Sequence, residues 1–323
     1  MRRSVIGCLV ALLVLAYAQP ARADRTYRVG ILEVVSPAMN AANFAAFKEG
    51  LRDLGYVEGR NLVIDYRSAD GHPERFPVLA AELAKAKPDV IVARTTVAVT
   101  SARAAAPATP IVMAATGDPV ATGLAASLAR PGGMVTGLTS LSAAVSAKRL
   151  QLVKEAFPSI QRVGNLIDTG TGLTTQWKIL EQSARGVGLT PLLFDVRKTA
   201  DLAPAFDAAV KQRADALVVG GGTVLQTNLG RVVELAAKHR LPAVYNNAEF
   251  VDRGGLMAYA VSFPPLYRRA ATYVDRLLKG ANPAELPIEQ PTQFELVVNV
   301  RTARALGLTL PQSLLLRADR IVE

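Results

Sequence analysis

The sequence predicts an α/β protein built from two doubly wound parallel-sheet lobes joined by a hinge. Short β-branched runs alternate with longer Ala-, Leu-, Lys- and Arg-rich stretches of helical period, which is the pattern of parallel sheets covered by helices. A helix that ends before Pro158 separates two rounds of this alternation. A single ten-stranded sheet would be unusually wide, so two successive lobes fit the pattern better.

The first round of the alternation supplies five strands. We expect strands at 28–34, 62–66, 90–93, 111–114 and 135–138, with helices at 43–54, 74–86, 97–105 and 123–129. A further helix over 143–156 ends before Pro158, because the residue before a proline disfavours helical backbone.

The second round repeats the architecture without a fixed-period sequence repeat. We expect strands at 162–167, 192–195, 216–219, 243–245 and 256–260, with helices at 173–187, 202–212, 224–239 and 266–278. Gly280 and Pro283 end the last long helix, and residues 295–299 supply one more strand.

The returning segments at the end of the chain predict how the lobes are divided. By analogy with two-lobed sheets, we expect one lobe to use residues 24–140 and 261–287, and the other residues 141–260 and 288–323. The segments that cross between the lobes would then act as the hinge.

The N-terminus predicts an export signal over residues 1–23. Arg2 and Arg3 precede a 12-residue apolar run, and Ala21 and Ala23 stand where a signal peptidase reads small residues. Such a run is shorter than the ~20 residues of a membrane span, so we expect cleavage near Ala23 and a periplasmic protein. Cleavage would also remove the single cysteine, Cys8, which excludes thiol catalysis and thiolate metal sites from the mature chain.

Composition and missing motifs exclude several further classes of protein. A hydrophobic content of 50% rules out intrinsic disorder as the main state. The net charge of +10 is spread along the chain and aromatic residues are only 6%, so we expect no nucleic-acid partner. His72 and His239 stand apart, and no HExxH, G-x-S-x-G or paired-carboxylate motif is present. We therefore expect binding without turnover, with no cofactor and no metal.

Polar residues follow almost every predicted strand. In open α/β sheets the ligand site lies at the carboxyl ends of the strands. Hydroxyls and carboxamides beside helix N-termini suit a small polar or zwitterionic solute, and the helix N-termini favour its carboxylate. The candidate ligand-binding residues are Ser36, Thr95, Thr96, Thr116, Asp118, Thr139, Asp168, Thr169, Thr223, Asn246, Asn247 and Glu249.

Each candidate also has a purely structural interpretation. Asp118 before Pro119 is an ordinary helix cap, and the threonines can cap helices in the same way. Asn246 and Asn247 suit a turn, while Glu249 suits a solvated surface. The glycines at 220–222 lack the lysine and spacing of a phosphate loop. Trp177, the lone tryptophan, suits either helix packing or the edge of the cleft.

Several longer motifs carry a family resemblance that covers nearly all of the mature chain. They are Leu-Gly-Tyr-Val-Glu-Gly-Arg-Asn-Leu at 54–62, Gly-Asp-Pro-Val at 117–120, Leu-Ala-Arg-Pro-Gly-Gly at 128–133, Gly-Gly-Leu-Met at 254–257, Leu-Tyr-Arg-Arg-Ala-Ala at 266–271 and Phe-Glu-Leu-Val-Val-Asn at 294–299. In these motifs the chain resembles the extracytoplasmic solute-binding proteins of ABC transporters, in the substrate-binding family that includes tryptophan- and tyrosine-type binders.

The resemblance implies a type I periplasmic-binding-protein fold whose lobes close on a solute. It also implies delivery of that solute, an amino acid or a small organic acid, to an inner-membrane permease driven by a separate ATPase. We expect a monomer. Where family members often have Asn-Pro after the first strand of the second lobe, this chain has Asp168-Thr169, so the ligand cannot be copied from a relative. A periplasmic sensor for a signalling receptor is the alternative, and a Rossmann-type enzyme is a weaker one because no phosphate fingerprint follows the first strand.

Overall fold

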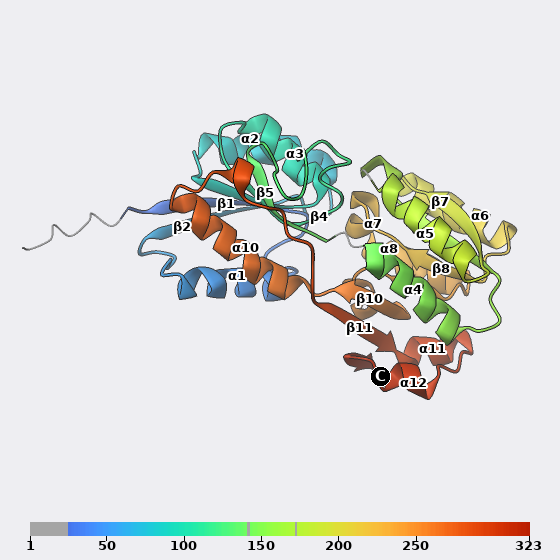
Figure 1. The fold of residues 1–323 in the computed structure, drawn as a ribbon. Helices are drawn as coiled ribbons and strands as arrows, with labels where there is room; N and C mark the ends of the chain where they lie inside the picture. The colour runs from blue at the N-terminus through green and yellow to red at the C-terminus, as the bar shows by residue number, and fades with distance from the viewer. Residues whose placement is uncertain (1–24, 141–142, 172) are drawn as a thin grey trace, which may run out of the picture.

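The computed structural model places two α/β lobes side by side, each with its own sheet (Figure 1). The structure describes residues 25–140, 143–171 and 173–323. The predicted signal peptide and Cys8 lie outside the described residues. Within those ranges, no helix is both long enough and apolar enough to cross a membrane.

The first lobe is built on a five-stranded sheet in the order β2-β1-β3-β4-β5. All four strand pairings are parallel. The strands are β1 (Tyr27–Glu33), β2 (Leu62–Ser68), β3 (Val90–Arg94), β4 (Ile111–Thr116) and β5 (Val135–Thr139). Because helices cover both faces, β3 and β4 are buried along their whole length and read as continuous apolar runs.

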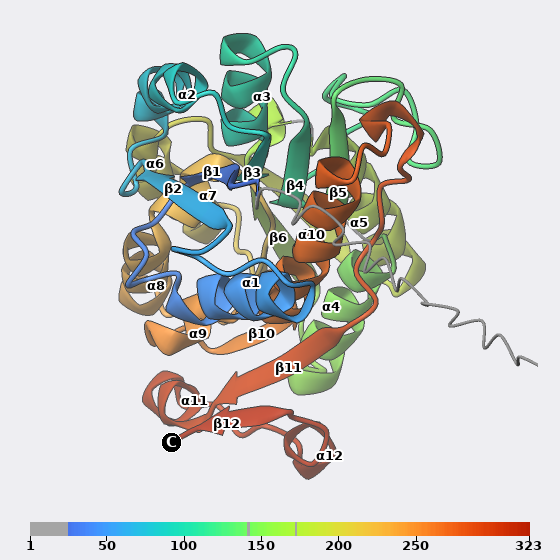
Figure 2. The same cartoon turned by 90° about the vertical axis from the view of Figure 1, so that its left-hand side faces the viewer.

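Helices α1 (Ala41–Asp53) and α10 (Phe263–Leu278) cover one face of this sheet. They lie side by side in both views, although they are far apart in the sequence (Figures 1 and 2). Gly50 permits this close packing, because a Cβ at that position would stand 2.9 Å from the Cβ of Ala271. The other face carries α2 (Phe76–Lys85), which follows the 3₁₀ turn η1 (Pro73–Arg75), and α3 (Thr96–Ala105).

The helix predicted over 123–129 does not form. Residues 117–134 connect β4 to β5 through turns and irregular backbone. Gly123 and Gly132 adopt φ of +66° and +77°, a left-handed conformation that ends helices. The prediction was wrong because apolar spacing was given more weight than these glycines and Pro131.

The second lobe has a seven-stranded sheet in the order β12-β11-β10-β9-β8-β6-β7. Only the β10–β11 pairing is antiparallel among the strands that the structure describes. The strands are β6 (Arg162–Ile167), β7 (Thr190–Asp195), β8 (Ala216–Val219), β9 (Ala243–Tyr245), β10 (Met257–Val261), β11 (Phe294–Asn299) and β12 (Arg320–Val322). We had not predicted β12.

Helices cover both faces of this second sheet. They are α4 (Ala143–Ala156), α5 (Thr174–Gly186), α6 (Leu202–Lys211), α7 (Thr223–Thr227), α8 (Leu229–Lys238), α9 (Glu249–Asp252), α11 (Val300–Leu306) and α12 (Gln312–Leu315), with 3₁₀ turns η2 (Thr169–Thr171) and η3 (Thr199–Asp201). A further 3₁₀ turn, η4 (Pro283–Glu285), lies beside β5 in the first lobe. The single helix predicted over 224–239 is two helices, α7 and α8. They separate at Asn228, whose side-chain amide donates to the Val224 carbonyl oxygen.

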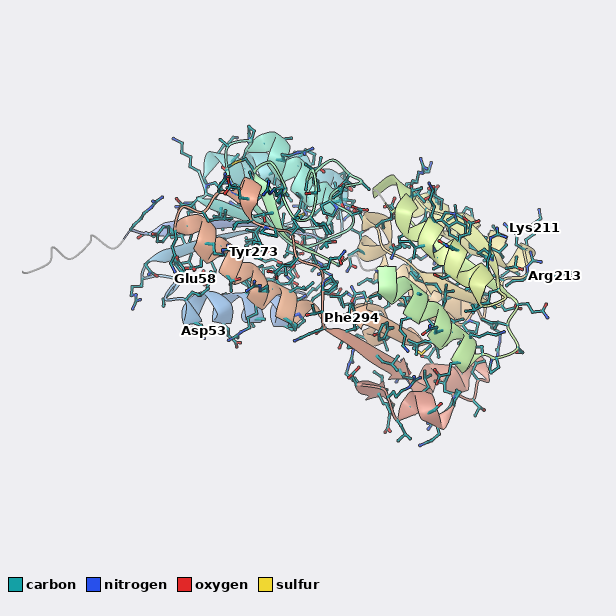
Figure 3. All side chains as sticks on the ribbon, viewed as in Figure 1. Asp53, Glu58, Lys211, Arg213, Tyr273 and Phe294 are labelled. Carbon is teal, nitrogen blue, oxygen red and sulfur yellow. The ribbon has the colours of Figure 1, made fainter. Side chains whose placement is uncertain are left out.

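Two connections between the lobes run side by side. The chain leaves β10 for α10 at Ser262, whose N–H donates to the carbonyl oxygen of Gln293 on the returning segment. Figure 3 labels Phe294 at the start of β11, between the two lobes. Glu289 still pairs with β5, because its N–H donates to the Gly137 carbonyl oxygen at 2.9 Å. The lobe borders we gave above stay a prediction.

Candidate functional site

A cavity of about 90 Å³ lies between the lobes, at the carboxyl ends of strands from both sheets. Strand ends of the first lobe supply one wall, while α4, α5, α7 and the β8 and β9 loops of the second lobe supply the other. Its lining consists of Arg94, Thr95, Thr96, Ala115, Thr116, Gly117, Ser140, Arg149, Leu173, Gln176, Gly221, Gly222, Thr223, Gln226, Asn246, Val261 and Phe263.

Arg149 brings a buried positive charge to the wall formed by the second lobe. It stands on the inward face of α4, in the helical series that includes Val145, Leu152 and Val153, and it is 4% exposed. Its Nε donates to the Tyr259 carbonyl oxygen at 2.8 Å. No carboxylate among the described residues forms an ion pair with it, so burial lowers the pKa of its guanidinium to about 10. The group stays charged at neutral pH without a counter-ion.

Arg94 brings a second buried guanidinium to the opposite wall, and this one is paired. Its Nη2 lies 3.2 Å from Glu249 Oε1, and its planar end lies 4.3 Å from the centre of the Phe263 ring. Burial by itself would lower the pKa of Arg94, but the negative charge of Glu249, with Tyr267 and Glu33 behind it, raises that pKa above the ordinary value.

A hydrogen-bond network holds Glu249 in position to meet Arg94. Gln226 Nε2 donates to Glu249 Oε2 at 3.1 Å, and Asn247 Nδ2 donates to Gln226 Oε1 at 3.1 Å. Asn247 Oδ1 in turn accepts from the Glu249 N–H at 2.9 Å. Because Arg94 belongs to the first lobe and Glu249 to the second, their ion pair joins the two walls of the cavity.

Three buried polar atoms on the cavity wall lack a hydrogen-bond partner among the described residues. They are Nη1 of Arg94, Oγ1 of Thr223 and Oδ1 of Asn246. A buried polar atom left unpaired costs about 1–3 kcal/mol, and native proteins rarely leave several together. Their convergence on one cavity indicates that a polar ligand completes the site.

Gly222 and Asp168 determine the backbone conformation next to Thr223. Gly222 adopts φ of +126°, and a Cβ at that position would overlap the Cβ of Asp168. Asp168 is 3% exposed and accepts from the N–H groups of Gly170 and Val224 at 3.1 and 3.5 Å. Burial raises the pKa of Asp168, although these N–H groups favour its ionised form. Asp168 therefore supports the loop from behind while Thr223 faces the cavity.

Comparison with known proteins assigns the chain to a family. Residues 28–322 match the model of the family described as ABC transporter substrate binding protein. The chain belongs to the ABC transporter substrate-binding protein family. This confirms the resemblance found in the sequence, and the two-lobed α/β architecture confirms the predicted type I periplasmic-binding-protein-like fold.

Three relatives of this substrate-binding protein illustrate the match. A protein named tyrosine-binding protein from Clostridioides difficile (strain R20291) is 26% identical over 87% of this chain and 81% of its own. A conserved domain protein from Vibrio cholerae is 27% identical with a TM-score of 0.84, covering 92% of this chain and 100% of its own. An ABC domain from Streptococcus pneumoniae, solved in complex with L-Trp, is 25% identical with the same TM-score and the same coverage.

Five of the twelve predicted site residues line the cavity of this substrate-binding protein: Thr95, Thr96, Thr116, Thr223 and Asn246. Asn247 and Glu249 lie just behind its wall, in the network that meets Arg94. Thr95 has a second role, because its Oγ1 also caps α3 by accepting from the Ala98 N–H at 3.4 Å. Contact of these residues with a solute stays a prediction.

The other five predicted residues lie outside the lining and are occupied by local hydrogen bonds. Ser36 Oγ accepts from the Met39 N–H, and Asp118 Oδ1 caps the N–H groups of Val120 and Ala121 at 3.0 Å. Thr139 Oγ1 donates to the Gly117 carbonyl oxygen, and Thr169 bonds to Asp195. Asp168 stands behind Gly222. Contact of these five residues with a solute also stays a prediction.

The sequence analysis missed the cavity residues that come from helices. Arg149, Gln176 and Gln226 lie inside or near helices rather than directly after strands. One available signal was the charge of Arg149 on the apolar stripe of its helix. Trp177 packs against the core of the second lobe and does not line the cavity. No cluster of three or more His, Cys, Asp or Glu side chains that could hold a metal occurs within the described ranges.

Proposed function

We propose that this protein captures a small solute with a carboxylate group, an amino acid or a small organic acid, and hands it to the permease of an ABC importer. Export by a signal peptide cleaved near Ala23 would place it in the periplasm. The names of two relatives, a tyrosine-binding protein and a domain solved with L-Trp, support a solute of this kind.

One observation carries the proposal: the buried guanidinium of Arg149, on the wall of the cavity between the lobes, has no ion-pair partner among the described residues. A buried cation without a partner is costly, and a planar guanidinium matches a carboxylate through two parallel N–H···O bonds. A carboxylate solute would therefore supply a counter-ion for the buried guanidinium of Arg149.

Closure of the lobes would couple binding to delivery. The Arg94–Glu249 ion pair would form only when the two walls meet. A solute that bridges the walls would likewise stabilise only the closed state. The permease would then recognise the distance between the lobes. Among the described residues, the lining offers no histidine, lysine or carboxylate for general acid–base chemistry, and we propose binding without turnover.

A thermal-shift screen of the purified mature chain tests this function. Amino acids, organic acids and neutral sugars are added separately, and each hit is measured by calorimetry. A true solute at 100 times its Kd adds about 2.7 kcal/mol to the free energy of unfolding. Mass spectrometry should recover the solute unchanged after incubation, and deletion of the gene should abolish uptake of the labelled compound. Stabilisation by neutral sugars alone, or conversion of the solute into product, would contradict the proposal.

A further inference from the structure

We propose that the cavity selects a small 2-hydroxycarboxylate anion over the amino acid of the same carbon skeleton. This inference rests on the proposed function, because it specifies the solute that the same cavity holds. It depends on three features. Among the described residues, Arg149 has no ion-pair partner, the cavity lining contains no acidic side chain, and the buried polar atoms without a partner need both a donor and an acceptor.

The first step fixes the position of the carboxylate. Arg149 has no acidic partner in the part of the chain that the structure describes, whereas Arg94 already pairs with Glu249 at 3.2 Å. A solute carboxylate gains most at Arg149, where it neutralises a buried charge that nothing else compensates.

The second step follows from covalent geometry. The nitrogen of an amino acid lies within about 3 Å of its own carboxylate oxygens. An ammonium group would thus be held beside Arg149, where none of the lining residues carries a negative charge. The three neighbouring positions outside the described ranges, 141, 142 and 172, are Leu, Ser and Gly in the sequence and carry no carboxyl group either.

The acidic side chains behind the cavity wall are engaged elsewhere, and Glu33, behind Arg94, accepts from Tyr267 and the Val34 N–H. Glu249 accepts from both Arg94 and Gln226, and Asp168 accepts from the backbone of Gly170 and Val224 behind the Gly222 loop. Among the charged side chains that line the cavity, Arg94 pairs with Glu249, whereas Arg149 has no ion-pair partner among the described residues. A monoanion cancels the charge of Arg149, whereas a zwitterion brings a second positive charge next to it.

The third step concerns the neutral polar atoms. Asn246 Oδ1 needs a donor, Arg94 Nη1 needs an acceptor, and Thr223 Oγ1 can serve as either. A hydroxyl group both donates and accepts, so it can satisfy the first two atoms together. A 2-oxo group only accepts and would leave Asn246 unpaired. Leu173, Val261 and Phe263 offer apolar surface to the rest of the molecule.

Matched triplets of ligands test the inference by calorimetry on the wild-type mature protein. Each triplet contains an amino acid, its 2-hydroxy acid and its 2-oxo acid, on the carbon skeletons of alanine, valine, leucine, phenylalanine, tyrosine and tryptophan. We expect the hydroxy acid to bind at least tenfold more tightly than the amino acid in every triplet that binds, with the oxo acid between them. Equal or tighter binding of the amino acid would overturn the inference and leave the proposed function standing. Failure of every member to bind would overturn both.

A charge-adding variant sharpens the test. Asn246→Asp places a carboxylate in the lining, so we expect the preference for the hydroxy acid to shrink at least tenfold or to reverse. Gln151→Glu, on the exposed face of α4 and outside the lining, is the matched amide-to-carboxylate control and should leave the preference unchanged. Melting temperatures and circular dichroism confirm that both variants fold. An unchanged preference in a folded Asn246→Asp protein would overturn the argument from charge.

Discussion

The two lobes each bury one arginine at the same cavity, and the two side chains have opposite environments. Arg94 of the first lobe is 2% exposed, pairs with Glu249 across the cleft and stacks on Phe263. Arg149 of the second lobe is 4% exposed, and its Nε donates to the backbone carbonyl oxygen of Tyr259. The pKa of the first is raised by its carboxylate partner, whereas burial lowers the pKa of the second.

This difference suggests two separate roles: Arg94 stabilises the contact between the lobes, and Arg149 is available to bind a solute. A charge that the protein itself neutralises contributes to the closed structure, since its partner lies on the other lobe. A charge left without a partner costs stability until a ligand supplies one. Lys211 and Arg213, by contrast, lie at the end of the second lobe that is far from the first (Figure 3).

The largest expected effect comes from replacing each arginine by methionine, which keeps much of the apolar bulk. Arg94→Met leaves Glu249 without its partner and should lower the free energy of unfolding by about 3 kcal/mol. Arg149→Met removes an unpaired buried charge and should leave the ligand-free protein unchanged or stabilise it by about 1 kcal/mol. Urea unfolding without ligand measures both. Equal destabilisation by the two changes would remove the distinction between the arginines.

The next effect concerns closure. Glu249→Gln keeps an acceptor for Gln226 but removes the negative charge that pairs with Arg94. We therefore expect a larger population of the open form and a loss of about 2 kcal/mol in the free energy of solute binding. Small-angle scattering with and without solute, together with calorimetry, measures both changes. Glu181→Gln breaks an exposed pair with Arg185 and serves as the control, with an expected change under about 0.5 kcal/mol. A Glu249→Gln protein that closes and binds like the parent would show that the pair does not hold the lobes.

A smaller effect distinguishes a hydroxyl that faces the cavity from one that also caps a helix. Thr223→Val removes a hydroxyl without a protein partner, so solute affinity should fall by about 1 kcal/mol while stability is unchanged. Thr95→Val removes the cap of α3 as well, so both affinity and stability should fall, each by about 1 kcal/mol. Calorimetry and thermal unfolding of the two variants test the contrast. A stability loss in Thr223→Val equal to that in Thr95→Val would contradict it.

The smallest effect concerns Asp118, a predicted site residue that lies outside the cavity lining. Asp118→Ala removes the cap on Val120 and Ala121 and should cost about 1 kcal/mol of stability, with solute affinity unchanged. Thermal unfolding and titration with the solute measure the two quantities. A tenfold loss of affinity without a change in stability would restore the original expectation that Asp118 contacts the ligand.

Much of the fold was predictable because its signals are local. Strands over Arg162–Ile167, Ala216–Val219 and Ala243–Tyr245 match the predicted bounds, since short β-branched runs between turns identify buried parallel strands. The missed elements are short ones at the end of the chain, such as β12 and α12, where three or four residues are too few to show a period.

The sequence by itself determined the two rounds of strand and helix and the family, and polar residues at strand ends pointed to Thr95, Thr223 and Asn246 on the cavity wall. Only the tertiary structure decided that Arg149, from the middle of a helix, completes the cavity and that Arg94 meets Glu249, 155 residues away. The physical reason is the distance along the chain over which each effect acts. Backbone preferences and hydrophobic period act over a few residues, whereas the partner of a buried charge is chosen by how two separately folded lobes come together.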